Sequence, residues 1–531
     1  MSEPGAEKTA TTPSGKSWAA ALTELKKREA AAAAGGGADK QQEQRDRGRL
    51  TARERVETLL DAGSFVELNA LAEHQCRDFG MEQKVFPGDG VITGHGTVHG
   101  RRVFIFAEDE TVLGGSMGRV HGEKIHYVLR LARETLAPVI GLYASGGARI
   151  QEGMDNVYGV TGMFHQNALN SGVVPQIAAI MGTASGGAAY SPALCDFILQ
   201  IKGTSMFLTG PAVIKEVTGE EVSFEDLGGS RVHAGKSGVV HLTANDDRHC
   251  LEIIRELLGF LPQSNRVQPP RLAVADPVDR QTPELTELVP IEPNKPYDMR
   301  KAIRAIADDG AYFEIHGAFA RNMTVGFLRI GGGAVGVVAN NPQFIGGCLD
   351  LDAADKAARF IRTCDAFNVP LLTLADTPGF RPGVKQEHAG IIRHGAKMLY
   401  AWTEASVPKI IVILRKLYGG SIPAMGVHEI GFDQVFAWPI AEMQMVGAEA
   451  AVRILYRREL AKAADPDALF AAKVKEYQDL YLTPYHSAGR KVVDAVITPA
   501  DTRRQIHAAL EMLAGKTEPA RAFRKHGNIP L

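Results

Sequence analysis

The 531-residue sequence contains only five cysteines, and no two of them stand at a spacing typical of a metal site. They occur singly, as Cys76, Cys195, Cys250, Cys348 and Cys364. Without a CxxC pair, neither a zinc site nor a disulfide framework is predicted. We therefore expect no metal site in this chain.

Long apolar runs and an excess of basic residues are also missing. No run of about 18 apolar residues occurs, so no membrane span is expected. The opening stretch MSEPGAEKTATTPSGK lacks the apolar segment of a secretory signal, which favours a cytoplasmic location. The formal net charge of −2 argues against a nucleic-acid surface. With 45% hydrophobic and 23% charged residues, the chain has the composition of a globular protein of two or more domains.

What the sequence does contain is a repeat. HGRRVFIFAEDETVLGGSMG is paralleled by GGGAVGVVANNPQFIGGCLD, and VPQIAAIMGTASGGAAYSP by VPKIIVILRKLYGGSIPAM. Three glycine landmarks recur in the same order at an offset of roughly 232 residues. They pair Gly114 with Gly346, Gly147 with Gly379, and Gly187 with Gly420. A fixed offset predicts a duplicated structural unit, and the order strand, glycine turn, helix, strand predicts an α/β fold.

The composition also predicts the domain boundaries. A stretch dense in proline and without apolar periodicity separates the two copies, and both ends of the chain are polar. The predicted segments are 1–44, a mobile tail and solvated helix without specific function; 45–265, the first domain; 266–296, a linker; 297–515, the second domain; and 516–531, a tail.

Local patterns predict several elements of the first domain. LTARERVETLLDAGSFVEL places Thr51 three residues before Glu54, the signature of a capping box at a helix start. GVITGHGTVHGRRVFIFAEDE predicts a β-hairpin, and GEKIHYVLRLARETL an amphipathic helix. APVIGLYASGG and VVPQIAAIMGTASGG each read as a buried strand that ends in glycines.

Two glycine pairs at the ends of strands are the first candidate sites. Gly186–Gly187 and Gly419–Gly420 leave backbone N–H groups uncovered, and such groups can stabilise an oxyanion. A tight turn is the alternative for either pair alone, but their recurrence in a duplicated unit favours a function. Ile422 and Pro423, which follow the second pair, are expected to line the pocket that these amides face.

Two further glycine turns predict anion binding near a helix start. They are ASGGARIQEG, with Ser145, Gly146, Gly147 and Arg149, and DTPGFRPG, with Asp376, Gly379 and Gly383. For Arg149 the alternative is that it only neutralises Glu152.

Other patterns point away from catalysis by side chains. GGGAVG matches a dinucleotide-binding string, but β-like residues follow it, so a hairpin turn is predicted instead. Ser185 in GTASGG is interpreted as a helix cap, because no spacing selects His233, His388 or His394 as its base.

A series of ordered motifs resembles one known family. GGSMGRVHGEKI, SGGARIQEG, SGGAAYSPALCDF, FLTGPAVIKEVTGEEV, LGGSRVHAGKSGV, GIIRHGAKMLYA and FAWPIAEMQMVGAEAAV, with the segment from GCLDLDAADK to LADTPGF, look like the carboxyltransferase β subunit of biotin-dependent acyl-CoA carboxylases. The propionyl-CoA carboxylase type is the most similar, and the resemblance covers about residues 45–515.

The resemblance implies two tandem crotonase-like and Clp-like ββα-superhelix domains, with acyl-CoA on the first and carboxybiotin on the second. It implies an active site shared between the first domain of one subunit and the second domain of its partner, in a homohexamer. It assigns the thioester oxygen to Gly186 and Gly187, and the ureido oxygen of biotin to Gly420 and Ser421. The remaining cofactor-binding residues that it implies are Ser145, Gly146, Gly147, Arg149, Gly379, Phe380 and Gly419.

In this family the cofactor itself supplies the base, and backbone amides hold the enolates, which accounts for the lack of a catalytic histidine. The chain has no Met-Lys-Met biotinylation motif and no ATP-grasp-like segment. The resemblance therefore implies an α subunit with biotin carboxylase and biotin carrier functions. Decarboxylase or transcarboxylase subunits of the same architecture, a Clp-type serine peptidase and a non-catalytic scaffold stay open as alternatives.

Three residues depart from the family pattern near the expected acyl pocket. Pro423 stands where Asp or an aliphatic residue is usual, Ile422 replaces an aromatic residue, and Arg381 replaces an aliphatic one. These departures favour a longer, branched or polar acyl chain.

Overall fold

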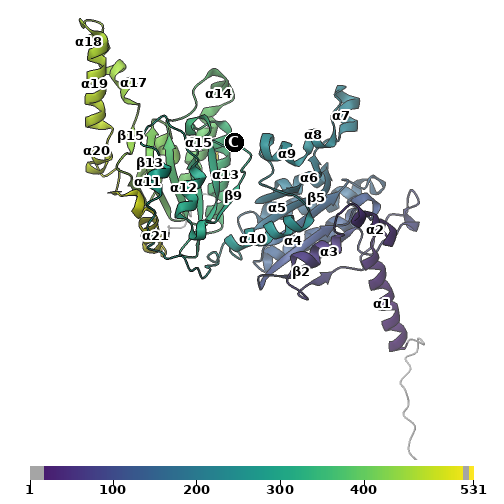
Figure 1. The fold of residues 1–531 in the computed structure, drawn as a ribbon. Coiled ribbons are helices and arrows are strands. Elements are labelled where there is room, and N and C mark those ends of the chain that lie inside the picture. The colour runs from purple at the N-terminus through teal and green to yellow at the C-terminus, as the bar shows by residue number, and fades with distance from the viewer. Residues whose placement is uncertain (1–16, 518–525) are drawn as a thin grey trace, which may run out of the picture.

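Two eight-stranded sheets form the centres of two consecutive domains (Figure 1). The computed structural model describes residues 17–517 and 526–531. The first sheet has the order β1-β2-β3-β4-β5-β6-β8, with β7 paired to β5. Its strands are β1 (Val66–Leu68), β2 (Val91–Val98), β3 (Arg101–Glu108), β4 (Val139–Ser145), β5 (Gln176–Ser185), β6 (Phe197–Ile201), β7 (Ser205–Phe207) and β8 (Leu242–Ala244).

The second sheet repeats the first strand for strand. Its order from β9 is β9-β10-β11-β12-β13-β14-β16, with β15 paired to β13. Its strands are β9 (Tyr312–Ile315), β10 (Met323–Ile330), β11 (Gly333–Asn340), β12 (Leu371–Thr377), β13 (Lys409–Tyr418), β14 (Gln434–Ala437), β15 (Glu442–Gln444) and β16 (Ala495–Val496). Each sheet begins with an antiparallel β-meander and continues with parallel strands.

The duplication extends to small irregularities. Pairing of β4 with β5 shifts register between Tyr143 and Ser145, and pairing of β12 with β13 shifts between Ala375 and Thr377. The glycine landmarks Gly114 and Gly346 both adopt a φ of 65° within a short 3-10 turn. Such bulges and left-handed turns are built features of a fold, so their recurrence confirms the predicted duplication.

Hairpin turns explain the antiparallel pairs at the start of each sheet. Val98 pairs with Arg101, and the two residues between them have positive φ, as tight hairpins require. Ile330 pairs with Gly333 across Gly331 and Gly332, whose φ values are 59° and 79°. GGGAVG is therefore a hairpin turn, as predicted.

Helices surround both sheets. In the first domain they are α3 (Ala52–Leu59), α4 (Arg119–Glu134), α5 (Met154–Asn170), α6 (Gly187–Ala193), α7 (Pro211–Thr218), α8 (Phe224–Gly228), α9 (Ser230–Val232) and α10 (Asp247–Phe260), preceded by α1 (Trp18–Ala34) and α2 (Ala38–Asp46). In the second they are α11 (Leu285–Leu288), α12 (Met299–Ile306), α13 (Leu351–Ala366), α14 (Val384–His388), α15 (Ile391–Glu404), α16 (Ser421–Met425), α17 (Ala448–Leu455), α18 (Arg457–Leu460), α19 (Pro466–Tyr481), α20 (Pro484–Gly489) and α21 (Thr502–Met512).

Two predicted helices are confirmed in detail. The capping box of α3 is complete, because the Thr51 side chain accepts from Glu54 N and the Glu54 carboxylate accepts from Thr51 N. The amphipathic helix α4 buries Ile125, Val128 and Leu129 against the sheet.

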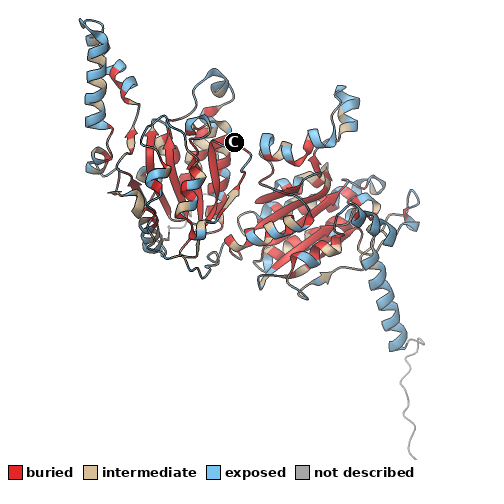
Figure 2. Cartoon of the chain, in the orientation of Figure 1, coloured by how far each residue is buried: buried red, intermediate tan, exposed pale blue. Residues whose placement is uncertain are grey.

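Most strand residues of both sheets are buried (Figure 2), and one cluster of buried apolar residues extends from the first domain into the second. Phe327 of β10 stacks on Phe260 of α10, with ring centroids 5.5 Å apart, and lies 6.1 Å from Phe197 of β6. His241 and His316 also stack there, at 4.3 Å. The two domains therefore share one apolar core.

The N-terminal segment departs in part from the predicted mobile tail and solvated helix over residues 1–44. Its first 16 residues lie outside the described part, and α1 is exposed along its length. The segment from Gly35 to α2, however, packs on the first domain. Gly36 N donates to Thr111 Oγ1 at 3.0 Å, and Lys40 Nζ donates to Thr111 O at 3.1 Å. The ordered domain thus begins before residue 45.

The predicted linker 266–296 also packs on a domain. Leu285 and Val289 are buried in the core of the second domain. Backbone carbonyls of the same segment accept hydrogen bonds from Arg415 and Lys416 of β13. Because the segment carries apolar side chains into that core, it belongs structurally to the second domain. Within residues 17–517 and 526–531, no helix is long and apolar enough to cross a membrane.

Candidate active site

The glycine pairs occupy equivalent turns between a long strand and a short helix. β5 leads through Gly186 into α6, and β13 leads through Gly419 into α16. These two glycines have φ values of 59° and 58°, which only glycine adopts readily. Their own N–H groups are used: Gly186 N donates to Phe207 O at 3.1 Å, and Gly419 N donates to Gln444 O at 3.0 Å.

We call the next two amides in each turn uncovered because they lack a hydrogen-bond acceptor in the described part of the chain, although the residues Ala188 and Ser421 are themselves fully buried. The N–H groups of Gly187 and Ala188, and those of Gly420 and Ser421, donate to no acceptor within the described residues. This agrees with their place in a first helical turn, where N–H groups lack a partner in the helix. The N–H groups of Gly186 and Gly419, one from each predicted glycine pair, are thus already bound to internal acceptors. In the first domain the uncovered pair lies one residue later than the predicted donors.

Hydrogen bonds hold the glycine turn after β4 next to the Gly186–Gly187 pair. Ser145 Oγ donates to Gly115 O at 2.6 Å, and Gly147 N donates to Ser145 Oγ at 3.1 Å. Ser185 Oγ donates to Gly146 O at 2.8 Å, which joins this turn to the end of β5. Ser185 therefore does not cap α6, whose N-cap residue makes no side-chain cap bond. A 3-10 turn over Ile150–Glu152 separates this turn from α5, which begins at Met154, so the turn does not adjoin the start of a long helix.

Within residues 17–517 and 526–531, no histidine forms a hydrogen bond with Ser185. The two ring nitrogens of His233 contact Ser237 Oγ at 2.8 Å and Met206 O at 2.7 Å. The hydrogen bond of Ser185 goes to a backbone carbonyl instead. This geometry gives no support to a serine nucleophile.

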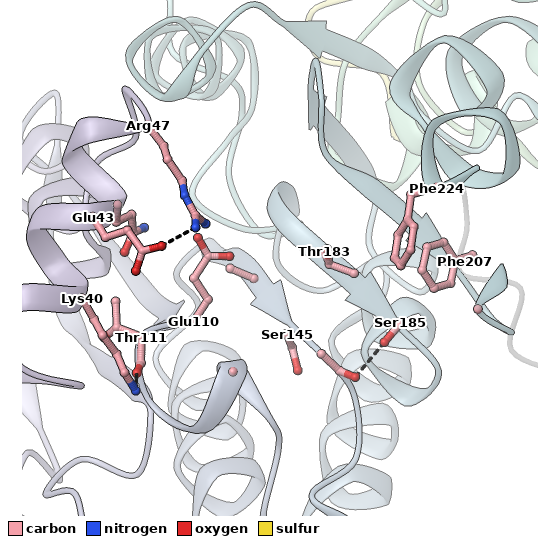
Figure 3. Close-up of a pocket in the computed structure, with 15 residues that line it drawn as sticks. Lys40, Glu43, Arg47, Glu110, Thr111, Ser145, Thr183, Ser185, Phe207 and Phe224 are labelled. Atoms are coloured by element: carbon pink, nitrogen blue, oxygen red, sulfur yellow. Dashed lines mark hydrogen bonds and ion pairs between the residues drawn. The ribbon is translucent and has the colours of Figure 1, made fainter. Parts of the chain in front are cut away.

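A pocket of about 560 Å³ opens beside the ends of β4 and β5 (Figure 3). One wall is formed by α2 and the loop after β3, and the other by Phe207 and Phe224, whose rings meet edge to face with centroids 5.3 Å apart. The pocket is lined by Lys40, Glu43, Gln44, Arg47, Glu110, Thr111, Gly114, Ala144, Ser145, Gly146, Thr183, Ser185, Phe207, Gly210 and Phe224. Of the predicted residues, Ser145 and Gly146 reach it. The contribution of α2 was not predicted, because its polar sequence carries no motif.

Arg149 points away from this pocket. Its guanidinium is 1% exposed and donates to Asp89 Oδ1 at 2.6 Å, Glu152 Oε1 at 2.8 Å and Ser116 O at 2.8 Å. All of these acceptors are internal, so the predicted role of Arg149 as an anion ligand does not match the structure. Its partners include Glu152, as the alternative interpretation expected.

In the second domain, Phe380 lies against the second glycine pair. A Cβ built on Gly420 would lie 3.4 Å from the Phe380 ring. Gly379, with a φ of 130°, donates its N–H to Thr377 Oγ1 at 3.2 Å. Ile422 and Pro423 are half-buried in α16, and Arg381 is exposed. The structure thus brings Phe380 and Gly420 together, while Arg381 extends into solvent.

A buried ion pair supports the same turn. Arg415 Nε donates to Asp376 Oδ2 at 2.9 Å, and both side chains are almost fully buried. Burial raises the pKa of the Asp376 carboxyl, although the charges of Arg415 and Lys416 act in the opposite direction. Burial likewise lowers the pKa of Lys416. The charges of Asp376 and Arg415 are paired inside the domain. They therefore do not compete with the amides of Gly420 and Ser421 for a ligand.

Residues 43–529 match the family model described as carboxyl transferase domain. The chain belongs to this family. It is 51% identical to the propionyl-CoA carboxylase carboxyltransferase subunit of Haloferax mediterranei, over 92% of this chain and 95% of that protein. It is 50% identical to the methylmalonyl-CoA carboxyltransferase 12S subunit of Propionibacterium freudenreichii subsp. shermanii, over 92% and 93%.

Among solved structures, the carboxyl transferase chain matches a transcarboxylase 12S hexamer with hydrolysed methylmalonyl-CoA bound. The TM-score is 0.94 at 48% identity, over 97% of this chain and 99% of that one. The predicted fold class is confirmed, and so is the predicted activity class: the chain is a biotin-dependent carboxyltransferase of the acyl-CoA carboxylase, decarboxylase and transcarboxylase family. The peptidase and scaffold interpretations are set aside.

Proposed function

We propose that the two pairs of uncovered amides are the two oxyanion sites of the carboxyl transfer. Gly187 and Ala188 hold the thioester oxygen of the acyl-CoA as its α-carbon becomes an enolate. Gly420 and Ser421 hold the ureido oxygen of biotin. One observation carries this assignment: both turns bind their first amide internally and leave the next two without an acceptor in the described residues. Preorganised N–H donors of this kind stabilise a developing oxyanion without any acid or base from the protein.

The second turn fits the ureido group of biotin in its chemistry. A ureido oxygen accepts two hydrogen bonds, and the turn offers two adjacent donors, on the exposed Gly420 and the buried Ser421, with the Phe380 ring beside Gly420. When bound, carboxybiotin supplies the activated carboxyl group and the base for the α-proton. The residues of this chain orient the two substrates and stabilise the negative charge that develops on the thioester and ureido oxygens.

The pocket of the first domain is proposed as the acyl-CoA site. It borders the turn 145–147 and combines two aromatic rings with the basic side chains of Lys40 and Arg47 (Figure 3). Aromatic rings suit the apolar and planar parts of CoA, and basic side chains suit its phosphates. Both solved relatives of transcarboxylase 12S type contain methylmalonyl-CoA or its hydrolysis product.

We further propose that six chains form a ring and that an α subunit delivers the carboxyl group on a biotin carrier. The hexameric assembly of the transcarboxylase 12S relative supports the first point. Relatives named as carboxylase, decarboxylase and transcarboxylase subunits are all 48–51% identical to this chain. The direction of the reaction is therefore assigned to the partner subunits rather than to the residues of this chain.

The assignment is tested with the chain alone. The purified oligomer is incubated with free biotin and malonyl-CoA analogues that carry different α-substituents, and biotin-dependent loss of CO₂ is followed. A rate with one analogue is expected, and that analogue identifies the acyl group. The absence of a rate with every analogue, in an assembled hexamer, would contradict the proposed function.

Pro423 and Ile422 of the second domain are proposed to shape the acyl pocket of a partner subunit's first domain, in the shared active site that the family resemblance implies. The Pro423→Asp variant is expected to raise the preference for the methyl-substituted analogue over longer ones by about 10-fold, the scale of one or two methylenes in a pocket. The ratio of kcat/KM values measures this preference. Pro466→Asp, which makes the same change in the exposed first turn of α19, is the control. An unchanged substrate profile in Pro423→Asp would show that Pro423 does not line the acyl pocket.

Lys40 is proposed to contact the CoA phosphates from α2. Lys40→Ala is expected to raise KM for the acyl-CoA by about 3- to 10-fold, the scale of one charge-assisted hydrogen bond, and to leave kcat within about 2-fold. Steady-state kinetics at low salt measure both constants. Lys475→Ala on α19, a side chain 77% exposed, should change neither. Equal KM values for Lys40→Ala and the unmodified chain would place the phosphates elsewhere.

A further inference from the structure

A buried glutamate supports the turn at the end of β4. Glu108, the last residue of β3, is fully buried, and its Oε2 accepts a hydrogen bond of 2.8 Å from Ala144 N. Ala144 lies at the register shift between Tyr143 and Ser145. A side chain, rather than a neighbouring strand, therefore satisfies this buried amide, which would otherwise destabilise the turn.

In the second domain, an uncharged residue accepts the hydrogen bond from the equivalent buried amide. Asn340 is the last residue of β11. Its Oδ1 accepts a hydrogen bond of 3.3 Å from Asp376 N, and its Nδ2 donates one of 3.3 Å to Gly347 O. Asp376 lies at the matching register shift. Both oxygen and nitrogen of this amide are used, so Asn340 needs no further partner.

Among the described residues, His121 is the one potential partner near the second carboxylate oxygen of Glu108. Glu108 Oε1 lies 3.5 Å from His121 Nε2, and neither atom has another partner. His121 Nδ1 lies 3.0 Å from the carbonyl oxygen of Asp89, which accepts only, so Nδ1 carries a hydrogen. Two bare acceptors facing each other in a fully buried site would be costly. A single hydrogen shared between Glu108 Oε1 and His121 Nε2 would give both buried atoms a partner. The counterpart of His121 in the second domain is Ala353, where no such hydrogen is needed.

The supported turn leads directly to the proposed acyl-CoA site. Ala144, Ser145 and Gly146 line the pocket, and Gly146 O accepts the hydrogen bond from Ser185 Oγ at the end of β5. Two residues beyond Ser185 the uncovered amides begin. A displacement of this turn therefore displaces the pocket wall that faces the reacting end of the substrate.

We propose that Glu108 is a positioning residue for the acyl half-site, held in place by the hydrogen shared with His121. It fixes turn 144–147 against the end of β5 and does not touch the substrate. The kinetic part of this inference rests on the proposed function, whereas the hydrogen bond to Ala144 is a property of the fold and can be tested separately.

The kinetic test compares three variants in biotin-dependent decarboxylation of methylmalonyl-CoA. Glu108→Ala is expected to lower kcat about 10- to 100-fold, the scale of a small misplacement of reacting groups, and to change KM by less than about 3-fold. Glu108→Gln keeps an acceptor for Ala144 N and can donate to His121, so most of the kcat should return. The double variant Glu108→Asn/His121→Ala copies the second domain and should also recover activity relative to Glu108→Ala. Glu134→Ala, on the exposed face of α4, is the control.

Hydrogen–deuterium exchange tests the same inference without activity. Peptides that cover 144–147 should exchange at least about 10-fold faster in Glu108→Ala than in the unmodified chain, and Glu108→Gln should restore slow exchange. Peptides that cover 376–379 serve as the internal reference. Unchanged exchange at 144–147, or a Glu108→Gln variant as impaired as Glu108→Ala, would overturn the positioning role. If the unmodified chain lacked decarboxylation, the proposed function would fail, and exchange would still decide this inference.

Discussion

The Gly187→Val variant is expected to lose about 100- to 1000-fold in kcat, the measured scale for removing one oxyanion donor. Gly187 has no positive φ, so a side chain is permitted by the backbone. Its Cβ, however, would lie 3.2 Å from Val160 Cγ1 and 3.9 Å from Met117 Cε. A branched side chain must therefore push the start of α6 away from its neighbours and move the amides with it. Biotin-dependent decarboxylation of methylmalonyl-CoA measures the loss.

The matched control is Gly235→Val, because a Cβ on Gly235 meets nothing within 4 Å in this chain. It makes the same chemical change in the same domain and should keep nearly full activity. Both variants must first be shown to form the same oligomer with a similar melting temperature. A correctly assembled Gly187→Val protein with near-normal turnover would exclude this amide from the chemistry.

The sequence predicted both glycine turns, but in the first turn the two amides without an acceptor in the described residues lie one residue later than the predicted donors. The repeat aligns Gly187 with Gly420, whereas the predicted donors were Gly186–Gly187 in one copy and Gly420–Ser421 in the other. The difference depends on β7 and β15, strands of three residues that flank the turns and bind the first amide of each. Strands so short leave almost no periodic signal, so their hydrogen bonds could not be anticipated.

The pocket walls were harder to predict than the fold. β-rich runs around a glycine turn predicted the hairpins, a capping box predicted α3, and an amphipathic pattern predicted α4, because local sequence dictates each of these features. The wall formed by α2 depends instead on a docking contact between Lys40 and Thr111, 71 residues apart. Polar residues on a solvated helix follow no pattern that distinguishes a pocket wall from a tail. The same holds for Glu108 and His121, whose pairing arises only when β3 and α4 meet.

Removal of the Arg149 guanidinium is expected to destabilise the fold strongly. In Arg149→Met, the carboxylates of Asp89 and Glu152 stay buried without their common partner. Breaking a buried pair in this way costs about 3–5 kcal/mol in the free energy of unfolding. Urea unfolding at a fixed protomer concentration measures the change. Arg231→Met, at a side chain 82% exposed, should change the free energy by no more than about 0.5 kcal/mol.

A second substitution separates this structural role from a role in binding CoA. Asp89→Asn in the Arg149→Met background removes one of the two unpaired charges, so part of the lost stability should return. If Arg149 instead held an anion of the substrate, Arg149→Met would weaken acyl-CoA binding at unchanged stability, and Asp89→Asn would not repair it. The guanidinium is buried and donates to three internal acceptors at 2.6 to 2.8 Å, and Arg149 does not line the pocket, so the stability effect should dominate. The equivalent Arg381 is exposed, and its loss should cost the fold little.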